Sequence, residues 1–204
     1  MKIGVLALQG GFIEHIHMLQ KLGVEAVPVY NPNELEAIDG LIIPGGESTT
    51  ILKLLHDFAL FKPLKKKAEN GLPIMGTCAG MVLLASKVTN PDMATLGLMD
   101  IAVRRNAFGR QVDSFQAEID LPALGEEPFA AIFIRAPFIE SAGDGVEVLG
   151  KLADGTAVAV RQENYLAIAF HPELGGDRRL HRYFLDIVAD SACKSADKKT
   201  IPAD

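Results

Sequence analysis

Short apolar runs alternate with amphipathic stretches through the first 95 residues of the chain. The apolar runs, each followed closely by Gly, Pro or Asn, predict strands over residues 2–8, 25–30, 40–44 and 72–75. Apolar residues at helical spacing predict helices over residues 12–22, 51–55 and 81–85. Ser48 and Thr49 are the expected N-cap of the second helix. This alternation favours βαβ units and a parallel sheet covered on both faces.

The pattern changes after residue 95, where strand-like runs follow one another without long helices between them. These runs predict strands over residues 101–103, 112–119, 131–134, 146–152, 157–161 and 166–170. We expect them to extend the same sheet in an antiparallel or mixed arrangement. An amphipathic helix is predicted over residues 178–188, and residues 191–204 are expected to form a flexible tail. The predicted fold is a single α/β domain over residues 1–190, a three-layer α/β/α sandwich with a mixed, mostly parallel sheet.

The composition fits one folded domain and excludes several other classes of protein. Of the 204 residues, 49% are hydrophobic and 23% are charged, which excludes a disordered chain. The net charge of −6 leaves no basic surplus for binding nucleic acid. The apolar runs are too short to span a membrane, and the start MKIGVLALQG predicts a strand and not a signal peptide. Two distant cysteines make no disulfide framework, so a cytoplasmic location is expected.

The segment Gly76-Thr77-Cys78-Ala79-Gly80 lies between a predicted strand and a predicted helix. This G-x-C-x-G pattern is typical of a nucleophile elbow with Cys in place of Ser. Its glycines permit a tight turn that lifts the thiol above the carboxyl edge of the sheet, where the start of the next helix favours the thiolate. A buried structural cysteine is the alternative interpretation.

A histidine and a carboxylate follow the last predicted strand, in the segment Phe170-His171-Pro172-Glu173. Residues two apart in an extended backbone face the same side, so the Glu173 carboxylate is expected to orient the His171 ring. The carboxyl ends of parallel strands meet at one edge, where open α/β sheets carry their active sites. We therefore expect His171 and Cys78 to share a site, although a satisfied core histidine is the alternative for His171 alone.

The segment Pro44-Gly45-Gly46-Glu47-Ser48 also follows a predicted strand and precedes a helix. Its glycine pair suits backbone N–H groups that face an oxyanion, although an ordinary strand-to-helix turn explains the segment on its own. Together the three segments support acyl transfer through a thioester. In that chemistry Cys78 attacks a carbonyl, the N–H groups of Ala79 and Gly46 hold the oxyanion, and His171 protonates the leaving amine.

Six segments resemble the glutaminase-subunit family of pyridoxal 5′-phosphate synthases, which is one of the class I glutamine amidotransferase families. These segments are residues 8–10, 44–50, 76–80, 105–111, 133–137 and 170–174, in the family's order. The resemblance implies hydrolysis of L-glutamine to L-glutamate and ammonia, with Cys78, His171 and Glu173 as the catalytic triad. The ammonia would pass to a separate synthase subunit that makes pyridoxal 5′-phosphate.

The same resemblance implies which other residues form the site. Glutamine would be bound by Gly46, Glu47, Ser48, Arg105, Ile134 and Arg135. Gln9 would support the oxyanion hole, alongside Gly46 and Ala79, when the synthase partner docks. No cofactor is expected, and no metal site, because His15 and His17 lie two apart on a predicted helix and do not share a face.

Three alternatives remain open. The glutaminase subunit of another amidotransferase, such as imidazole glycerol phosphate synthase, would share the triad, but the R-N-x-F-G-R-Q and P-G-G-E-S-T-T motifs speak against it. A non-catalytic stress or binding protein with a cysteine elbow would not need the H-P-E motif. A cysteine protease is the third alternative.

Overall fold

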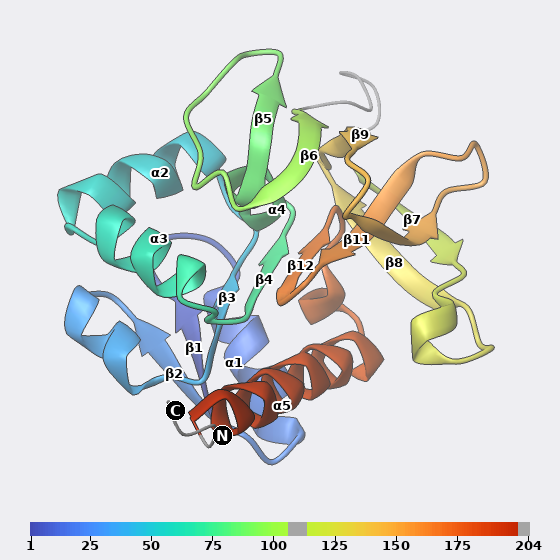
Figure 1. Cartoon of the computed structure of the whole chain (residues 1–204). Coiled ribbons are helices and arrows are strands. Elements are labelled where there is room, and N and C mark those ends of the chain that lie inside the picture. The colour runs from blue at the N-terminus through green and yellow to red at the C-terminus, as the bar shows by residue number, and fades with distance from the viewer. Residues whose placement is uncertain (106–113, 200–204) are drawn as a thin grey trace.

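The computed structural model describes residues 1–105 and 114–199, without the side chains of residues 195–199. A seven-stranded sheet lies at its centre, in the order β10-β11-β12-β4-β3-β1-β2 (Figure 1). Its parallel strands are β1 (Lys2–Leu6), β2 (Glu25–Val29), β3 (Gly40–Ile43), β4 (Ile74–Thr77) and β12 (Tyr165–Ile168). The antiparallel part consists of β11 (Ala157–Gln162), paired with β12 and with β10 (Glu147–Lys151). The predicted mixed, mostly parallel sheet is confirmed.

Helices flank this sheet on both sides. Helices α1 (Phe12–Lys21) and α5 (Arg179–Lys199) lie on one side of the central strands, and α2 (Ser48–Asp57) and α3 (Phe61–Glu69) on the other (Figure 1). The short helix α4 (Ala79–Leu84) packs directly on β4. The described residues also form three 3-10 helices: η1 (Pro32–Ala37), η2 (Pro122–Leu124) and η3 (Pro172–Leu174). Helix α5 continues past residue 188, where the sequence pattern predicts its end.

Two smaller sheets stand apart from the central one. One consists of β5 (Ala85–Thr89), β6 (Met99–Arg104) and β9 (Phe138–Ala142), and the other of β7 (Ser114–Ile119) and β8 (Phe129–Ile134). The prediction that β6, β7 and β8 extend the central sheet is therefore wrong. The reason is visible in their burial: residues along β6 and β8 alternate between buried and less buried, whereas β3 and β4 are buried throughout. Strands with only one buried face cover a core and do not run through it.

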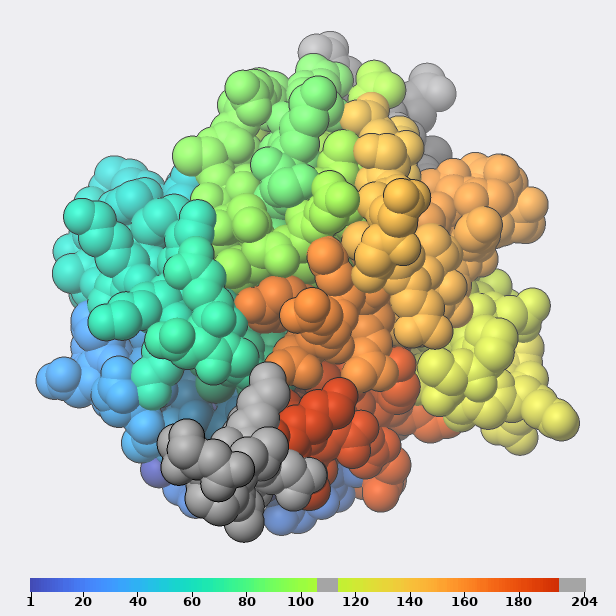
Figure 2. Space-filling model, viewed as in Figure 1, coloured from blue at the N-terminus to red at the C-terminus, as the bar shows by residue number. Residues whose placement is uncertain are grey.

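The core joins the two halves of the chain. Gly40 at the start of β3 packs so closely against α5 that a Cβ there would lie 2.7 Å from Val188 and 3.3 Å from Phe184. In the space-filling view the blue and green segments lie directly against the orange and red ones (Figure 2). Among the described residues, no helix is both long and apolar enough to cross a membrane.

Candidate active site

Four turns that follow strands of the central sheet meet at its carboxyl edge. The turns after β1, β3, β4 and β12 carry Gln9, Glu47, Cys78 and His171, and all four residues line one cavity of about 640 Å³. A larger cavity of about 860 Å³ lies near the opposite edge, between α3 and α5, and neither cysteine nor histidine lines it among the described residues. The chemistry-bearing side chains therefore gather where an open α/β sheet places its active site.

Cys78 lies in the sharp turn between β4 and α4, as the elbow pattern predicts. Its φ is 49° and its ψ is −102°, a sparsely populated backbone conformation that costs a non-glycine residue about 1–3 kcal/mol. The flanking glycines let α4 approach the sheet: a Cβ on Gly76 would lie 2.6 Å from the backbone of Gly80, and a Cβ on Gly80 would overlap the carbonyl oxygen of Ile43. This close packing fixes the turn that holds Cys78 at the cavity.

His171 reaches the same cavity from the turn after β12. A Cβ on Gly45 would lie 3.0 Å from His171 Nδ1 and 3.4 Å from Cys78 Cβ, so the two side chains meet beside one glycine. Nδ1 of the same ring donates to Oε1 of the buried Glu173 at 2.7 Å. His171 and Glu173 do project together, as the sequence predicts.

The ionisation of His171 follows from these neighbours. Burial lowers the pKa of His171, but the Cys78 sulfur and the Glu173 carboxylate outweigh burial and raise this pKa from 6.5 to about 10. The ring is therefore an imidazolium at neutral pH, and it stabilises negative charge on the adjacent sulfur. Such a pair combines a nucleophile with a proton donor.

Replacing Cys78 with alanine is expected to lower the pKa of His171 below about 10, because one of the groups that raise it is lost. An NMR titration of the His171 ring protons measures this change. The exposed Cys193 provides the control, since Cys193→Ala should leave the titration of His171 unchanged. Identical titrations for Cys78→Ala and the unaltered chain would contradict the pairing of Cys78 with His171.

The raised pKa of His171 also makes folding pH-dependent. The stabilisation from the charged ring is complete below pH 6.5 and disappears as pH rises through about 10.

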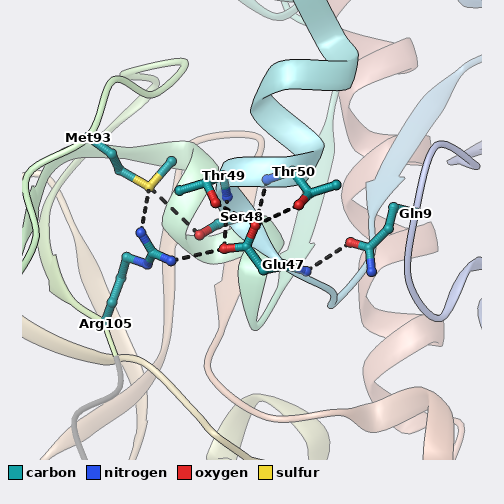
Figure 3. Close-up of polar contacts among 7 residues, drawn as sticks. All are labelled: Gln9, Glu47, Ser48, Thr49, Thr50, Met93 and Arg105. Carbon is teal, nitrogen blue, oxygen red and sulfur yellow. Dashed lines mark hydrogen bonds and ion pairs between the residues drawn. The ribbon is translucent and has the colours of Figure 1, made fainter.

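Glu47, and not Ser48 or Thr49, is the N-cap of α2, so the predicted cap is wrong. The Glu47 carboxylate accepts hydrogen bonds from the backbone N–H groups of Thr49 and Thr50, at 3.2 and 2.6 Å. It also accepts hydrogen bonds from the hydroxyl groups of these two threonines (Figure 3). A carboxylate reaches several donors of the first turn at once, which a single hydroxyl does not. Desolvation raises the pKa of Glu47, but these hydrogen bonds outweigh it and lower the pKa to about 2. Glu47 is therefore negatively charged at neutral pH.

A chain of polar contacts extends from Glu47 in both directions (Figure 3). Arg105, directly after β6, places Nη2 at 3.0 Å from Glu47 Oε1, and its Nη1 lies 3.6 Å from the sulfur of Met93. Ser48 Oγ donates to the same sulfur at 3.7 Å. On the other side, Gln9 Oε1 accepts the Glu47 N–H at 2.8 Å. The cavity thus carries a fixed carboxylate and a fixed guanidinium side by side.

The structure brings every predicted binding residue to this cavity. Its wall includes all the residues that the family resemblance implies for glutamine and the oxyanion hole: Gln9, Gly46, Glu47, Ser48, Ala79, Arg105, Ile134 and Arg135. Ala79 is the first residue of α4, so its N–H has no acceptor within the helix. The Ile134 carbonyl lies 3.9 Å from Cys78 Sγ, and Arg135 follows it with a φ of 45°.

Some wall residues were not predicted from the sequence. Val82, Ser114 and Pro137 also line the cavity, and Met93 contacts two of its polar side chains. Pro137 lies in the family-like segment 133–137 but carries no reactive group, and Val82, Ser114 and Met93 lie outside the six family-like segments. Residues 106–111 of the R-N-x-F-G-R-Q motif lie outside the described residues.

Several proteins are similar to this chain along nearly its whole length. The chain is 60% identical over 192 residues to "Pyridoxal 5′-phosphate synthase subunit PdxT" of Dehalococcoides mccartyi, covering 93% of this chain and 98% of that protein. It is 58% identical over 196 residues to the protein of the same name from Pelotomaculum thermopropionicum, covering 95% and 100%. A solved structure described as a crystal structure of glutamine amidotransferase matches with a TM-score of 0.87 and 46% identity, covering 93% of this chain and 100% of that one.

The family assignment rests on a match along nearly the whole chain. The model of the SNO glutamine amidotransferase family matches residues 5–190, which contain all the site residues described above. The expected class of fold and the expected family agree with this match. The chain therefore belongs to the SNO glutamine amidotransferase family.

Proposed function

We propose that this protein hydrolyses L-glutamine to L-glutamate and ammonia through a thioester on Cys78, and delivers the ammonia to a separate synthase subunit that makes pyridoxal 5′-phosphate. The observation that carries the proposal is the meeting of Cys78, His171 and Glu173 at the wall of one cavity. A thiol beside an imidazole that a carboxylate orients is the arrangement that covalent acyl transfer requires. Membership of a glutamine amidotransferase family supports glutamine as the acyl donor.

The charges of the cavity suit an amino acid. Free glutamine carries an α-ammonium and an α-carboxylate, and the cavity offers the Glu47 carboxylate and the Arg105 guanidinium next to each other. The negative charge of Glu47 would attract the ammonium, and Arg105 would donate to the carboxylate. Held by that end, the side-chain amide extends toward Cys78.

The reaction then proceeds in two halves. The Cys78 thiolate attacks the amide carbon, and the N–H groups of Ala79 and Gly46 hold the oxyanion, with Gln9 supporting the Gly46–Glu47 turn. As the carbon–nitrogen bond breaks, His171 gives its proton to the leaving nitrogen and ammonia departs. A water molecule then attacks the thioester while the neutral His171 takes one of its protons; the carbon–sulfur bond breaks, glutamate leaves with release of the second proton to solvent, and the Cys78 thiolate is restored beside the His171 imidazolium.

The fate of the ammonia explains why a partner is needed. Ammonia becomes protonated in water and loses its nucleophilicity, so it must pass directly to the enzyme that uses it. The described cavity holds groups for amide hydrolysis, and the synthesis of the pyridoxal ring is assigned to the partner subunit. Both cysteines are free, which suits the reducing cytoplasm where we place the protein.

Glutamate release in the presence of different synthase subunits tests this function. The purified chain is mixed with a pyridoxal 5′-phosphate synthase subunit or, separately, with an imidazole glycerol phosphate synthase subunit. We expect glutamate release to rise only with the first, and glutamine labelled with ¹⁵N at the amide to yield ¹⁵N in the pyridoxal ring. Stimulation only by the second subunit would identify a different amidotransferase. An absence of glutamate release in both mixtures would reject the enzymatic function.

A further inference from the structure

Two buried histidines lie behind the Glu173 carboxylate, and the reaction described above does not use them. His15 comes from α1 and His181 from α5, and the side chains of both are fully buried. Polar side chains are rarely buried so completely without a specific set of partners. Their contacts lead from the interior of the protein to the predicted catalytic groups.

His15 lies between the carboxylate and the second histidine. Its Nε2 forms a hydrogen bond of 3.3 Å with Thr77 Oγ1, which belongs to the residue directly before Cys78. The same Nε2 lies 3.4 Å from Glu173 Oε2, a buried carboxylate oxygen that has no hydrogen bond of its own among the described residues, so His15 is placed to supply the donor that Oε2 lacks. Its Nδ1 is 2.9 Å from His181 Nε2. Since Glu173 Oε1 binds His171 Nδ1, the contacts form one continuous path from His171 through Glu173 and His15 to His181.

The neighbours determine where the protons lie on these rings. Burial, together with His181 and His171, lowers the pKa of His15 well below 6.5, and burial lowers the pKa of His181 to about 4, so both rings are neutral at pH 7. A proton on His15 Nδ1 would leave the bare lone pair of Nε2 facing the Glu173 carboxylate. A proton on His15 Nε2 instead faces the carboxylate oxygen and stabilises its charge.

The far end of the path favours the same arrangement. Among the described residues His181 Nδ1 has no hydrogen-bond partner, and it is buried. A proton there would be a buried donor without an acceptor, and His181 Nε2 would then have to accept from His15 Nδ1. With its proton on Nε2, His181 donates to His15 Nδ1, and His15 keeps its own proton on Nε2. Both ends of the path therefore select the Nε2–H form of each ring.

We propose that His15 is a positioning residue: its Nε2–H holds Glu173 Oε2 so that Oε1 stays on His171 Nδ1, and His181 fixes the proton of His15 on Nε2. The groups that face this path come from several elements. They are Thr77 and Cys78 at the end of β4, His171 and Glu173 around η3, and the two histidines of α1 and α5. The consequence for catalysis rests on the proposed glutaminase function, whereas the proton positions do not.

The proton positions are measurable in the free chain. Long-range ¹H–¹⁵N NMR spectra distinguish the two neutral forms of a histidine ring. We expect the Nε2–H form for both His15 and His181 at pH 7. A proton on Nδ1 of His15, or a charged His15 ring, would overturn the proposal whether or not the chain hydrolyses glutamine.

Variants at residue 15 test the positioning role. In His15→Leu the donor is lost, and we expect kcat for glutamine hydrolysis, measured with the synthase subunit, to fall about tenfold or more while KM stays within about twofold. The downfield proton resonance of His171 Nδ1–H should broaden, because Glu173 is no longer held. His15→Gln places an amide N–H near the position of Nε2 and should recover most of the lost kcat.

His17 provides the matched control, since it lies on the same helix but is exposed. His17→Leu should keep the kcat of the unaltered chain. A folded His15→Leu with unchanged kcat and an unchanged His171 resonance would overturn the proposal, as would a His15→Gln variant no better than His15→Leu. Retention of hydrolysis in Cys78→Ala would instead reject the proposed glutaminase function, and the NMR result on the free chain would still decide the proton positions.

Discussion

Replacing Cys78 with alanine is expected to lower kcat for partner-stimulated glutamine hydrolysis by about four orders of magnitude or more. The thioester needs a nucleophilic sulfur at the elbow, and among the described residues Cys78 is the cysteine that lines the cavity. His171 and Glu173 remain in place in this variant, but no thiol is present to attack the amide carbon. Glutamate release, followed over hours with saturating synthase subunit, measures the residual rate.

The second cysteine gives this experiment its control. Cys193 is exposed on α5, away from the cavity lining, so Cys193→Ala should retain the full rate. An electrophile that mimics glutamine should add one label to the unaltered chain and to Cys193→Ala, and none to Cys78→Ala. Comparable glutamate release from Cys78→Ala and Cys193→Ala would exclude a thioester mechanism.

Replacing Gly80 with alanine is expected to lower the free energy of unfolding by about 3 kcal/mol. The added methyl group would overlap the carbonyl oxygen of Ile43, and backbone of a buried strand does not move aside as a flexible side chain would. Helix α4 would have to shift away from β3, and Cys78 at its N-terminus would shift with it. Urea unfolding measures the loss of stability, and labelling of Cys78 by the glutamine mimic measures the displacement of the thiol.

A glycine in open space separates this packing effect from the general effect of the substitution. A Cβ on Gly176 would meet no atom within 4 Å, and the residue has no left-handed φ. Gly176→Ala should therefore change the stability by less than about 1 kcal/mol. Equal stabilities of the Gly80→Ala and Gly176→Ala variants would show that α4 does not depend on the close approach.

The sequence predicts the strands of the central sheet better than their surroundings. The run of residues 40–44 contains glycine and apolar residues and ends in proline. A strand with this composition can be buried on both of its faces, so the sequence predicts both β3 and its place in a parallel sheet. Strands β6 and β8 alternate between buried and less buried residues, and this pattern does not reveal which core they cover. Their separation from the central sheet depends on contacts between distant segments.

Local sequence patterns predict the reactive groups of the site, but they do not predict the residues that hold those groups in position. Cys78 and the His171–Glu173 pair are marked by a turn and by spacing at a strand end, which constrain geometry locally. His15 is one residue of an amphipathic helix in the sequence. Its contact with Glu173 depends on the packing of α1 beneath η3, which no short segment encodes. Glu47 was expected in the pocket but not as a cap, because its reach to two N–H groups depends on the shape of the turn.

The two small sheets have a consequence for how such a protein diversifies. The thiol and the imidazole are anchored to turns of the central sheet, whereas Ile134 is the last residue of β8 in the separate hairpin, and Arg135 and Pro137 lie in its connection to β9. The groups that break the amide bond thus sit on the central sheet, whereas part of the cavity wall that faces them belongs to a separate scaffold. Natural selection can remodel the hairpin, and so the choice of donor or docking partner, while the machinery that breaks the amide bond is inherited unaltered.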